Sequence, residues 1–225
     1  MPHRGGGAFR ARICHGPGVS GRRLLLALLV ILVVAVVPSI VVPTLMCRPA
    51  DPELPDLGAV PAFSLTDERG EPFTEAALRG HATFVSFVFT RCESICPITS
   101  GKMEKLQEKT FDAGAGIKLL SVSVDPTYDT PARLAEYAQR FHADPARWHF
   151  LTGPLDRVHA LVEGPFMNSM QVEGKTITGV PQISHSGYFL LVDANLSIRG
   201  AYDSNDVTRL DAMVRDARYL HRISR

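Results

Sequence analysis

The chain has 225 residues, with 24 Lys and Arg against 23 Asp and Glu, and therefore a formal net charge of +1 at pH 7. Five of the basic residues and none of the acidic ones precede residue 47, so the rest of the chain carries 19 basic against 23 acidic residues. This mildly acidic balance argues against a nucleic-acid partner, and a stretch of about 180 residues suits one compact domain.

The segment from Leu24 to Met46 contains no charged residue over 23 positions. A helix of that length rises about 35 Å, enough to cross the hydrocarbon core of a bilayer. Arginines flank it on the N-terminal side, so the positive-inside tendency makes residues 1–23 a cytoplasmic tail. We therefore predict a single-pass anchor in the cytoplasmic (inner) membrane, a proline-rich linker at 47–60, and a domain at 61–225 that faces the periplasm or cell exterior.

Two other interpretations of the N-terminal segment remain open. It resembles a cleaved signal peptide in that its uninterrupted apolar run, Leu24 to Val37, has 14 residues before Pro38 and Pro43 interrupt it. The sequence has no A-x-A-like cleavage site, however, which favours a retained anchor. A lipoprotein signal ending at Cys47 is the third interpretation, but Met46 stands where a small residue is normally required.

The domain begins with patterns typical of strands. The stretch from Phe63 to Leu78 has an Asp-Glu-Arg-Gly centre, which predicts a small hairpin. A continuous apolar, β-branched and aromatic run from Thr83 to Phe89 is typical of a buried central strand. Pro97 then suits the first turn of a helix that ends at about Lys109.

The rest of the domain alternates strands and helices before it ends in a hairpin and a last helix. A strand is expected from Ile117 to Val124. Asp129 or Thr130 is placed to cap a helix from Pro131 to about Phe141. The later elements are a strand, a helix, a hairpin and a helix, at Trp148–Leu151, Pro154–Val162, Ser184–Val192 with Ser197–Tyr202, and 206–221. We therefore predict an α/β fold with a thioredoxin-like (peroxiredoxin-like) mixed sheet and flanking helices.

The stretch FVFTRCESICPITSG, at 87–101, places Cys92 and Cys96 between the buried strand and the next helix. Catalytic groups and ligands usually lie in such turns at the carboxyl edge of a sheet. Residues at i and i+4 project from one side of a helical turn, and the helix N-terminus favours the thiolate form. The pair suits either a disulfide or a metal, and the polar neighbours in this turn argue against mere core filling.

Two thiolates make an incomplete metal site, which a third soft or borderline ligand such as histidine would complete. The domain contains six histidines: His81, His142, His149, His159, His185 and His221. Most lie beside charged residues, where a solvated position is the default. His185 begins an apolar strand, in a loop expected at the same sheet edge as the cysteines, although a hydrogen-bonded loop histidine is an open alternative. Cys14 and Cys47 fall outside the domain and are assigned no role.

Four segments in the same order resemble the Sco/SenC family over about residues 60–220. The cysteine segment fits the family pattern of an apolar strand followed by F-x-F-T-x-C-x-x-x-C-P. The other segments resemble the family's opening hairpin, its second βα unit, and its histidine loop with the following hairpin. They are PAFSLTDERGEPF, SVSVDPTYDTPARLAEYAQRF and ISHSGYFLLVDANLSIRGAY.

The resemblance implies a membrane-anchored copper chaperone that helps to assemble the dinuclear copper centre of cytochrome c oxidase. Cys92 and Cys96 would bind Cu(I) or Cu(II) as thiolates, and His185 would be the third ligand. Asp125 would not bind copper directly but would orient a ligand or a loop. Alternatively, Asp125 only forms the turn before Pro126. Implied partners are cytochrome c oxidase subunit II or another copper-accepting protein, and a copper donor or thiol reductant.

A second function uses the same cysteines. Cys92 and Cys96 would then be the redox-active pair of a thiol-disulfide oxidoreductase that acts on extracytoplasmic cysteines. Enzymes of this fold more often use C-x-x-C, so the longer spacing favours copper. The chain departs from many relatives at Arg91 and Glu93, which makes redox potential and partner surface the least transferable properties.

Overall fold

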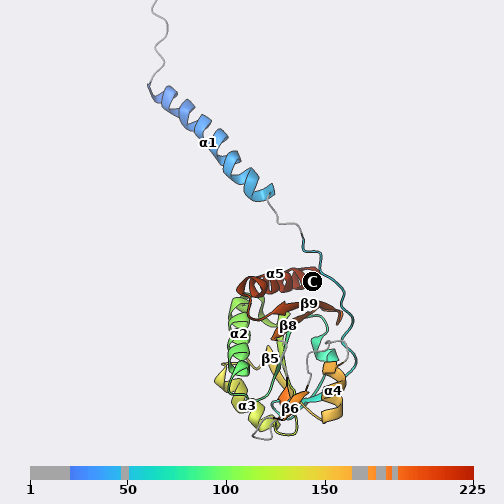
Figure 1. Cartoon of the computed structure of the whole chain (residues 1–225). Coiled ribbons are helices and arrows are strands. Elements are labelled where there is room, and N and C mark those ends of the chain that lie inside the picture. Colours follow the sequence, from blue (N-terminus) through green and yellow to red (C-terminus); the bar gives the residue numbers. More distant parts are fainter. Residues whose placement is uncertain (1–20, 47–50, 164–171, 176–180, 184–186) are drawn as a thin grey trace, which may run out of the picture. The chain divides into compact units, whose positions relative to one another are not determined.

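The computed structural model describes residues 21–46, 51–163, 172–175, 181–183 and 187–225. The chain divides into two compact units after residue 50, which are described separately. The first contains the helix α1 (Gly21–Met46). Counting only residues that the structure describes, no helix is long and apolar enough to cross a membrane. The second unit, Asp51–Arg225, holds the sheet and the remaining helices (Figure 1).

A seven-stranded mixed sheet forms the centre of this second unit, in the order β2-β1-β5-β4-β3-β8-β9. The three central strands β5, β4 and β3 are parallel, whereas β1 and β8 pair antiparallel with them on either side. In chain order the strands are β1 Ser64–Asp67, β2 Pro72–Thr74, β3 Ala82–Val88, β4 Ile117–Ser123, β5 Trp148–Thr152, β8 Tyr188–Val192 and β9 Ile198–Asp203. The predicted hairpins, now β1–β2 and β8–β9, are confirmed for their described residues.

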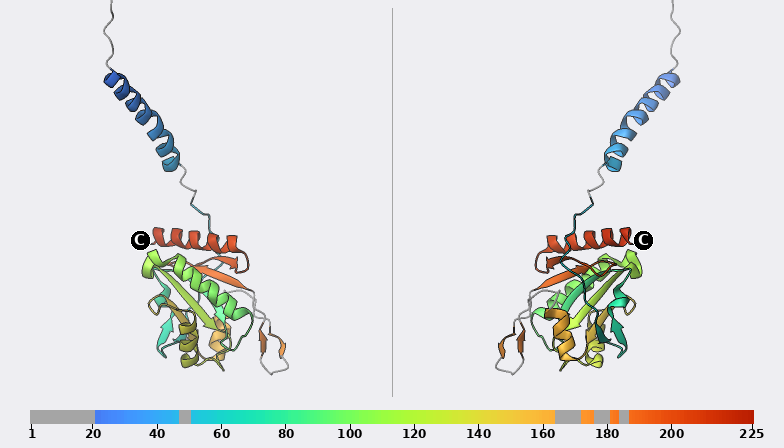
Figure 2. Two further views of the ribbon diagram at one scale, coloured as in Figure 1. Left: turned by 90° about the vertical axis from the view of Figure 1, so that its left-hand side faces the viewer. Right: turned by 90° about the vertical axis from the view of Figure 1, so that its right-hand side faces the viewer.

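Helices cover both faces of the sheet, as the strand and helix pattern predicts (Figure 2). Alternate side chains of β3 point to opposite faces, so Phe84 and Val88 join one core and Val85 joins the other. The first core includes residues of α2, α3 and α5, and the second includes residues of α4 and the short helix η1. The helices are η1 Glu75–Leu78, α2 Ile95–Lys109, η2 Phe111–Gly116, α3 Pro131–Arg140, α4 Leu155–Glu163 and α5 Val207–Ile223.

Two local features refine the sequence prediction. Thr130 is the N-cap of α3, because its hydroxyl accepts the Arg133 N–H at 3.3 Å, which leaves the Asp129 side chain for other contacts. A separate antiparallel pair, β6 (Val172–Lys175) and β7 (Pro181–Ile183), was not predicted. These strands are short and lack the apolar alternation that identifies a strand in sequence.

The sheet brings three chain segments to one edge. The parallel strands β3 and β4 end together, with Val88 paired to Ser123 and the Val124 N–H donating to the Val88 carbonyl at 2.9 Å. The segments that follow them, 89–94 and 124–130, therefore leave the sheet side by side. Since β8 is antiparallel to β3, it begins at the edge where β3 ends.

Candidate metal centre

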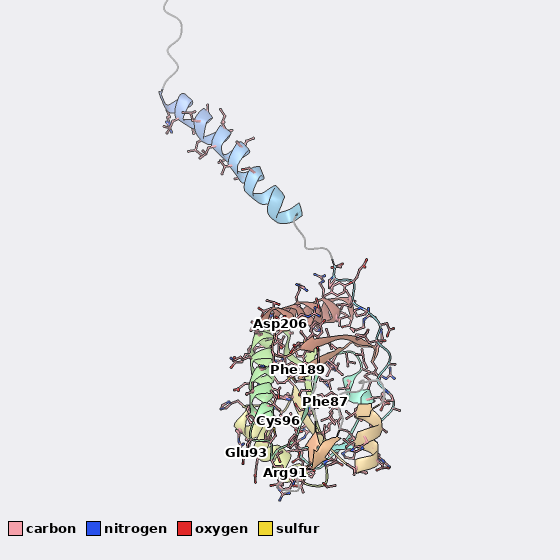
Figure 3. The ribbon with its side chains drawn as sticks, in the orientation of Figure 1. Phe87, Arg91, Glu93, Cys96, Phe189 and Asp206 are labelled. Carbon is pink, nitrogen blue, oxygen red and sulfur yellow. The ribbon has the colours of Figure 1, made fainter. Side chains whose placement is uncertain are left out.

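Cys96 lies in the first turn of α2 (Figure 3), and Cys92 lies in the short loop between β3 and that helix. Ser94 is the N-cap residue of α2 but makes no side-chain capping bond. The Cys96 N–H instead donates to Cys92 Sγ at 3.4 Å, so a sulfur takes the place of the usual capping oxygen. Pro97 has no N–H to satisfy in this turn. An amide that donates to sulfur at a helix N-terminus stabilises the thiolate form of Cys92.

Both sulfurs are more buried than the polar neighbours in the sequence suggested. Cys92 is 9% exposed and Cys96 is 1% exposed. They form a small apolar cluster with Phe89 and Val124, and Ile95 packs against it. The polar neighbours of Cys96 in the sequence therefore do not keep it exposed, because side chains from the ends of β3 and β4 cover it.

Neither cysteine is in a disulfide. A hydrogen bond with Cys92 and burial raise the pKa of the Cys96 thiol, and the nearby negative charge of Asp129 adds to this effect. The arrangement therefore favours Cys92 Sγ as a hydrogen-bond acceptor. Cys96 keeps its proton until a metal ion displaces it or oxidation forms a disulfide.

Asp125 contacts the cysteine loop through Arg91, the residue that precedes Cys92. Its Oδ2 accepts from Arg91 Nε at 2.6 Å and lies 2.6 Å from Nη2, and its Oδ1 accepts from the Thr127 hydroxyl at 3.0 Å. The Asp125 carbonyl also accepts the N–H groups of Tyr128 and Asp129 at 3.0 and 2.9 Å. The Asp125 backbone therefore forms the turn and its side chain contacts Arg91, while its role behind the copper ligands stays a prediction.

Asp129 makes a second connection to the loop, which the sequence did not indicate. This carboxylate is fully buried and accepts from Thr90 N–H at 3.1 Å, Thr90 Oγ1 at 2.5 Å and Ser123 Oγ at 2.5 Å. Burial raises the pKa of Asp129, although these hydrogen bonds act in the opposite direction. The only sequence signal was an acidic residue beside a helix start, which indicates a cap rather than a contact with Thr90, 39 residues away.

Arginine and tyrosine side chains form the rim beside the loop. The guanidinium carbon of Arg91 lies 4.7 Å from the centre of the Tyr128 ring, and that of Arg133 lies 3.9 Å from it. Ile98, in the first turns of α2, is 54% exposed. Arg91, the residue before Cys92, is thus part of a stacked group with Tyr128 and Arg133.

The third predicted ligand, His185, lies outside the described residues, as do Cys14 and Cys47. The structure describes the chain on both sides of His185, with β7 ending at Ile183 and β8 beginning at Tyr188. The Ser204 N–H donates to the Gly187 carbonyl at 2.8 Å, which attaches the start of β8 to the end of β9.

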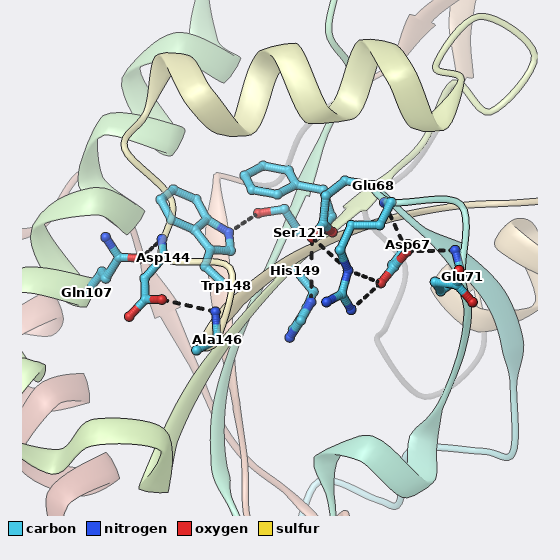
Figure 4. Close-up of polar contacts among 11 residues, drawn as sticks. Asp67, Glu68, Glu71, Gln107, Ser121, Asp144, Ala146, Trp148 and His149 are labelled. Carbon is cyan, nitrogen blue, oxygen red and sulfur yellow. Dashed lines mark hydrogen bonds and ion pairs between the residues drawn. The ribbon is translucent and has the colours of Figure 1, made fainter.

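A different group of metal-ligand residues lies where β1 pairs with β5 (Figure 4). Asp67, Glu68 and His149 place one ligand atom each within 4.8 Å of one another, and all three are buried. Arg69 already balances this cluster, because its Nη2 lies 2.6 Å from Asp67 Oδ2. Glu68 Oε2 accepts the Phe150 N–H at 2.9 Å, and its Oε1 lies 3.7 Å from His149 Nδ1. The cluster therefore works as an ion-pair network that joins the β1–β2 hairpin to β5, and it places His149 in the interior, not in solvent.

Comparisons with known proteins agree with the cysteine segment and the fold. The SCO1/SenC family model matches residues 53–220. The SCO1 protein homolog of Bacillus subtilis (strain 168) is 28% identical over 159 residues, which are 71% of this chain and 81% of that protein.

Two solved structures are similar over almost their whole length. BsSco is a member of the Sco family of cytochrome c oxidase assembly proteins in which a disulfide switch was identified; it is 25% identical, with a TM-score of 0.63 over 76% of this chain and 96% of that chain. Arabidopsis thaliana ScoI with copper bound is 26% identical, with a TM-score of 0.61 over 72% and 99%. These similarities confirm the α/β, thioredoxin-like fold. Because the solved chains consist almost entirely of this domain, the unit 51–225 is suited to study in isolation.

Proposed function

The chain belongs to the SCO1/SenC family, and from that premise we propose that it is a copper chaperone for the assembly of cytochrome c oxidase. Copper is its cargo, held as Cu(I) or Cu(II) by Cys92, Cys96 and His185. The observation that carries the proposal is the buried pair of cysteines at the N-terminus of α2, with Cys92 Sγ accepting the Cys96 N–H. A copper-bound relative of the same fold supports it.

The chemistry of this pair suits soft copper ions. Thiolates are preferred ligands of Cu(I), and two thiolates with an imidazole also accommodate Cu(II). Copper would displace the proton of Cys96. The hydrogen bond with Cys92 and burial raise the pKa of this thiol, whereas a bound cation would favour two thiolates side by side. The apolar residues Phe89 and Val124 exclude water from the sulfurs, which protects a reduced ion and strengthens its electrostatic attraction to thiolate.

The sheet topology supports His185 as the third ligand. β8 begins at the edge where β3 ends, and the cysteine loop leaves β3 at that edge. His185 precedes the first residue of β8, Tyr188, by three positions. Three residues span at most about 10 Å, so an imidazole in this segment is within reach of the cysteine turn.

Two carboxylates prepare the loop before copper arrives. Asp129 holds Thr90 and Asp125 holds Arg91, and these are the two residues before Cys92. A ligand positioned from behind in this way loses less conformational freedom on binding metal.

Transfer to a partner would begin at Cys92, the more exposed of the two sulfurs. An incoming thiolate or imidazole of the acceptor, cytochrome c oxidase subunit II or another copper-accepting protein, reaches copper on that side. The rim of Arg91, Tyr128 and Arg133 provides the contact surface. A copper donor and a thiol reductant would restore the loaded state, because oxidation of both thiols to a disulfide releases the metal.

The N-terminal segment completes the proposal as a single-pass anchor at residues 24–46. Its support is the sequence, in which 23 uncharged positions follow a flank that is only basic. The anchor would hold the domain at the outer face of the cytoplasmic membrane, where the copper centre of an oxidase is assembled.

A thiol-disulfide oxidoreductase is the second candidate. The hydrogen bond between the two cysteines favours this function. In such a pair the activated sulfur attacks a target disulfide to form a mixed disulfide, and the neighbouring cysteine then resolves it. The disulfide switch identified in BsSco agrees with thiol chemistry at this fold.

Copper stoichiometry of the isolated domain, residues 48–225, separates the two functions. We expect one copper per chain, because Cys92 and Cys96 are the domain's only cysteines. Cys92→Ser or Cys96→Ser should abolish this binding, and His149→Gln, which alters the buried acidic cluster, should preserve it. Near-zero copper with both thiols intact would overturn the chaperone proposal and leave the oxidoreductase.

A further inference from the structure

One face of α5 carries three arginines, Arg215, Arg218 and Arg222, and Arg225 follows two residues after the helix ends at Ile223. These four residues are here called the arginine stripe. Spacings of three and four residues place the three helical arginines within an arc of about 60°. The helical turn continues past Ile223, because the Ser224 N–H donates to the Leu220 carbonyl at 3.1 Å. All four side chains are exposed.

Two large apolar side chains lie beside the stripe. Ile223 is 59% exposed and follows Arg222 directly. Phe111 is 75% exposed at the start of η2, next to Asp112, which pairs with Arg218 at 2.6 Å. Arginines combined with exposed aromatic and aliphatic residues are typical of helices that lie on a membrane surface.

Acidic neighbours of the stripe do not neutralise it. Asp112 pairs with Arg218 at 2.6 Å and Asp51 pairs with Arg222 at 2.7 Å, and these four side chains are between 44% and 65% exposed. Arg215 lies 3.3 Å from the buried Asp216, but its own side chain is 64% exposed. Ion pairs this exposed are weak and easily exchanged. A phosphate group, which offers several acceptor oxygens to a guanidinium, competes effectively with them.

The start of the domain lies at the same place. Asp51 is the first residue of the second unit, and its contact with Arg222 places it beside the stripe. The chain after it stays on the domain, where the Leu54 carbonyl accepts from Arg199 and the Leu57 N–H donates to Ile198.

We propose that the arginine stripe, with Phe111 and Ile223, binds the anionic lipid headgroups of the membrane surface. The orientation of the domain on the membrane rests on the anchor in the proposed function. The binding itself does not depend on the anchor, because every residue of the surface belongs to the domain.

This contact would direct the cysteines away from the bilayer. Arg218 Nη2 donates to the carbonyl of Lys109, the last residue of α2, at 2.7 Å, whereas Cys96 lies in the first turn of that helix. A helix of 15 residues is about 20 Å long. Asp206, the N-cap of α5, and Arg91 of the cysteine loop likewise lie at opposite ends of the domain (Figure 3).

Vesicle sedimentation of the isolated domain tests the proposal. With phosphatidylcholine vesicles containing about a third phosphatidylglycerol, we expect binding at low salt and its loss at about 0.5 M NaCl, where charges are screened within about 4 Å. Arg222→Gln with Arg225→Gln should weaken partitioning about thirtyfold, roughly fivefold to sixfold per arginine. Phe111→Ser should weaken it roughly fivefold to tenfold.

The control is Arg79→Gln with Lys105→Gln, which removes the same charge from exposed positions elsewhere on the domain. This variant should bind vesicles like the unmodified domain. Absence of binding, equal binding to pure phosphatidylcholine, or an equal loss in the control variant would overturn the lipid site. Copper stoichiometry measured on the same samples should stay at one per chain, so failure of the lipid site is distinguished from failure of the copper proposal.

Discussion

Replacement of Asp129 by alanine tests whether this carboxylate supports the cysteine loop. The change leaves three donors without their acceptor: the partly buried Thr90 N–H and Thr90 hydroxyl, and the buried Ser123 hydroxyl. Hydrogen bonds to a charged group contribute about 1.5–3 kcal/mol each, or roughly 5–9 kcal/mol for three. The cost of burying the carboxylate, visible in its raised pKa, offsets part of this sum. We expect a net loss of about 3 kcal/mol in unfolding free energy.

Urea denaturation and copper competition measure the two consequences. A loop released from Asp129 should bind copper about 10 to 100 times more weakly, the usual effect of losing a group that orients a ligand. The control is Thr130→Ala, which removes the α3 cap at a cost of about 1 kcal/mol and leaves the loop contacts in place. If Asp129→Ala costs no more than Thr130→Ala and copper affinity is unchanged, the proposed support role is refuted.

Three further predictions address the third ligand, the membrane and pH. His185→Ala should weaken Cu(II) binding more than Cu(I) binding while Cys92 and Cys96 still form a disulfide; an unchanged sulfur-to-copper charge-transfer band would show that His185 is not a ligand. The full-length chain should stay in washed membranes with its domain accessible from outside the cell, and a soluble mature chain starting near residue 40 would indicate a cleaved signal peptide. Burial raises the pKa of Asp67, but contacts with Arg69 and two backbone N–H groups lower it by more, so this carboxylate stabilises the fold above about pH 4 and loses that contribution as the pH falls. Arg69→Gln should therefore lower the unfolding free energy by about 1 kcal/mol at neutral pH and by progressively less in acid. Urea titrations that show a pH-independent difference between this variant and the unmodified domain would contradict this.

Local patterns in the sequence were sufficient for most of the fold. The run from Thr83 to Phe89 is apolar at five of its seven positions, and β3 is a strand buried on both faces. The hairpin β8–β9 and the proline in the first turn of α2 also follow from neighbouring residues. These features depend on contacts close in sequence or on a repeating pattern.

The surroundings of the cysteines depend on residues that are distant in the chain. Phe89 and Val124 bury Cys96 because β3 and β4 end at the same height, a register that no local pattern specifies. Asp129 looked like a helix cap because its contact with Thr90 spans 39 residues. His185 lies outside the described residues, so its role as a ligand stays a prediction.

The double attachment of the cysteine loop also affects how the domain opens. Thr90 donates its N–H to Asp129, and the turn that contains Asp129 is closed by hydrogen bonds to the Asp125 carbonyl. The Thr90 amide is therefore shielded from solvent hydrogen exchange until the 124–130 turn opens as well, which makes the two loops one cooperative unit. Any slow opening that lets copper leave Cys96 would then appear at both loops with the same exchange rate, even though they are more than 30 residues apart in the chain.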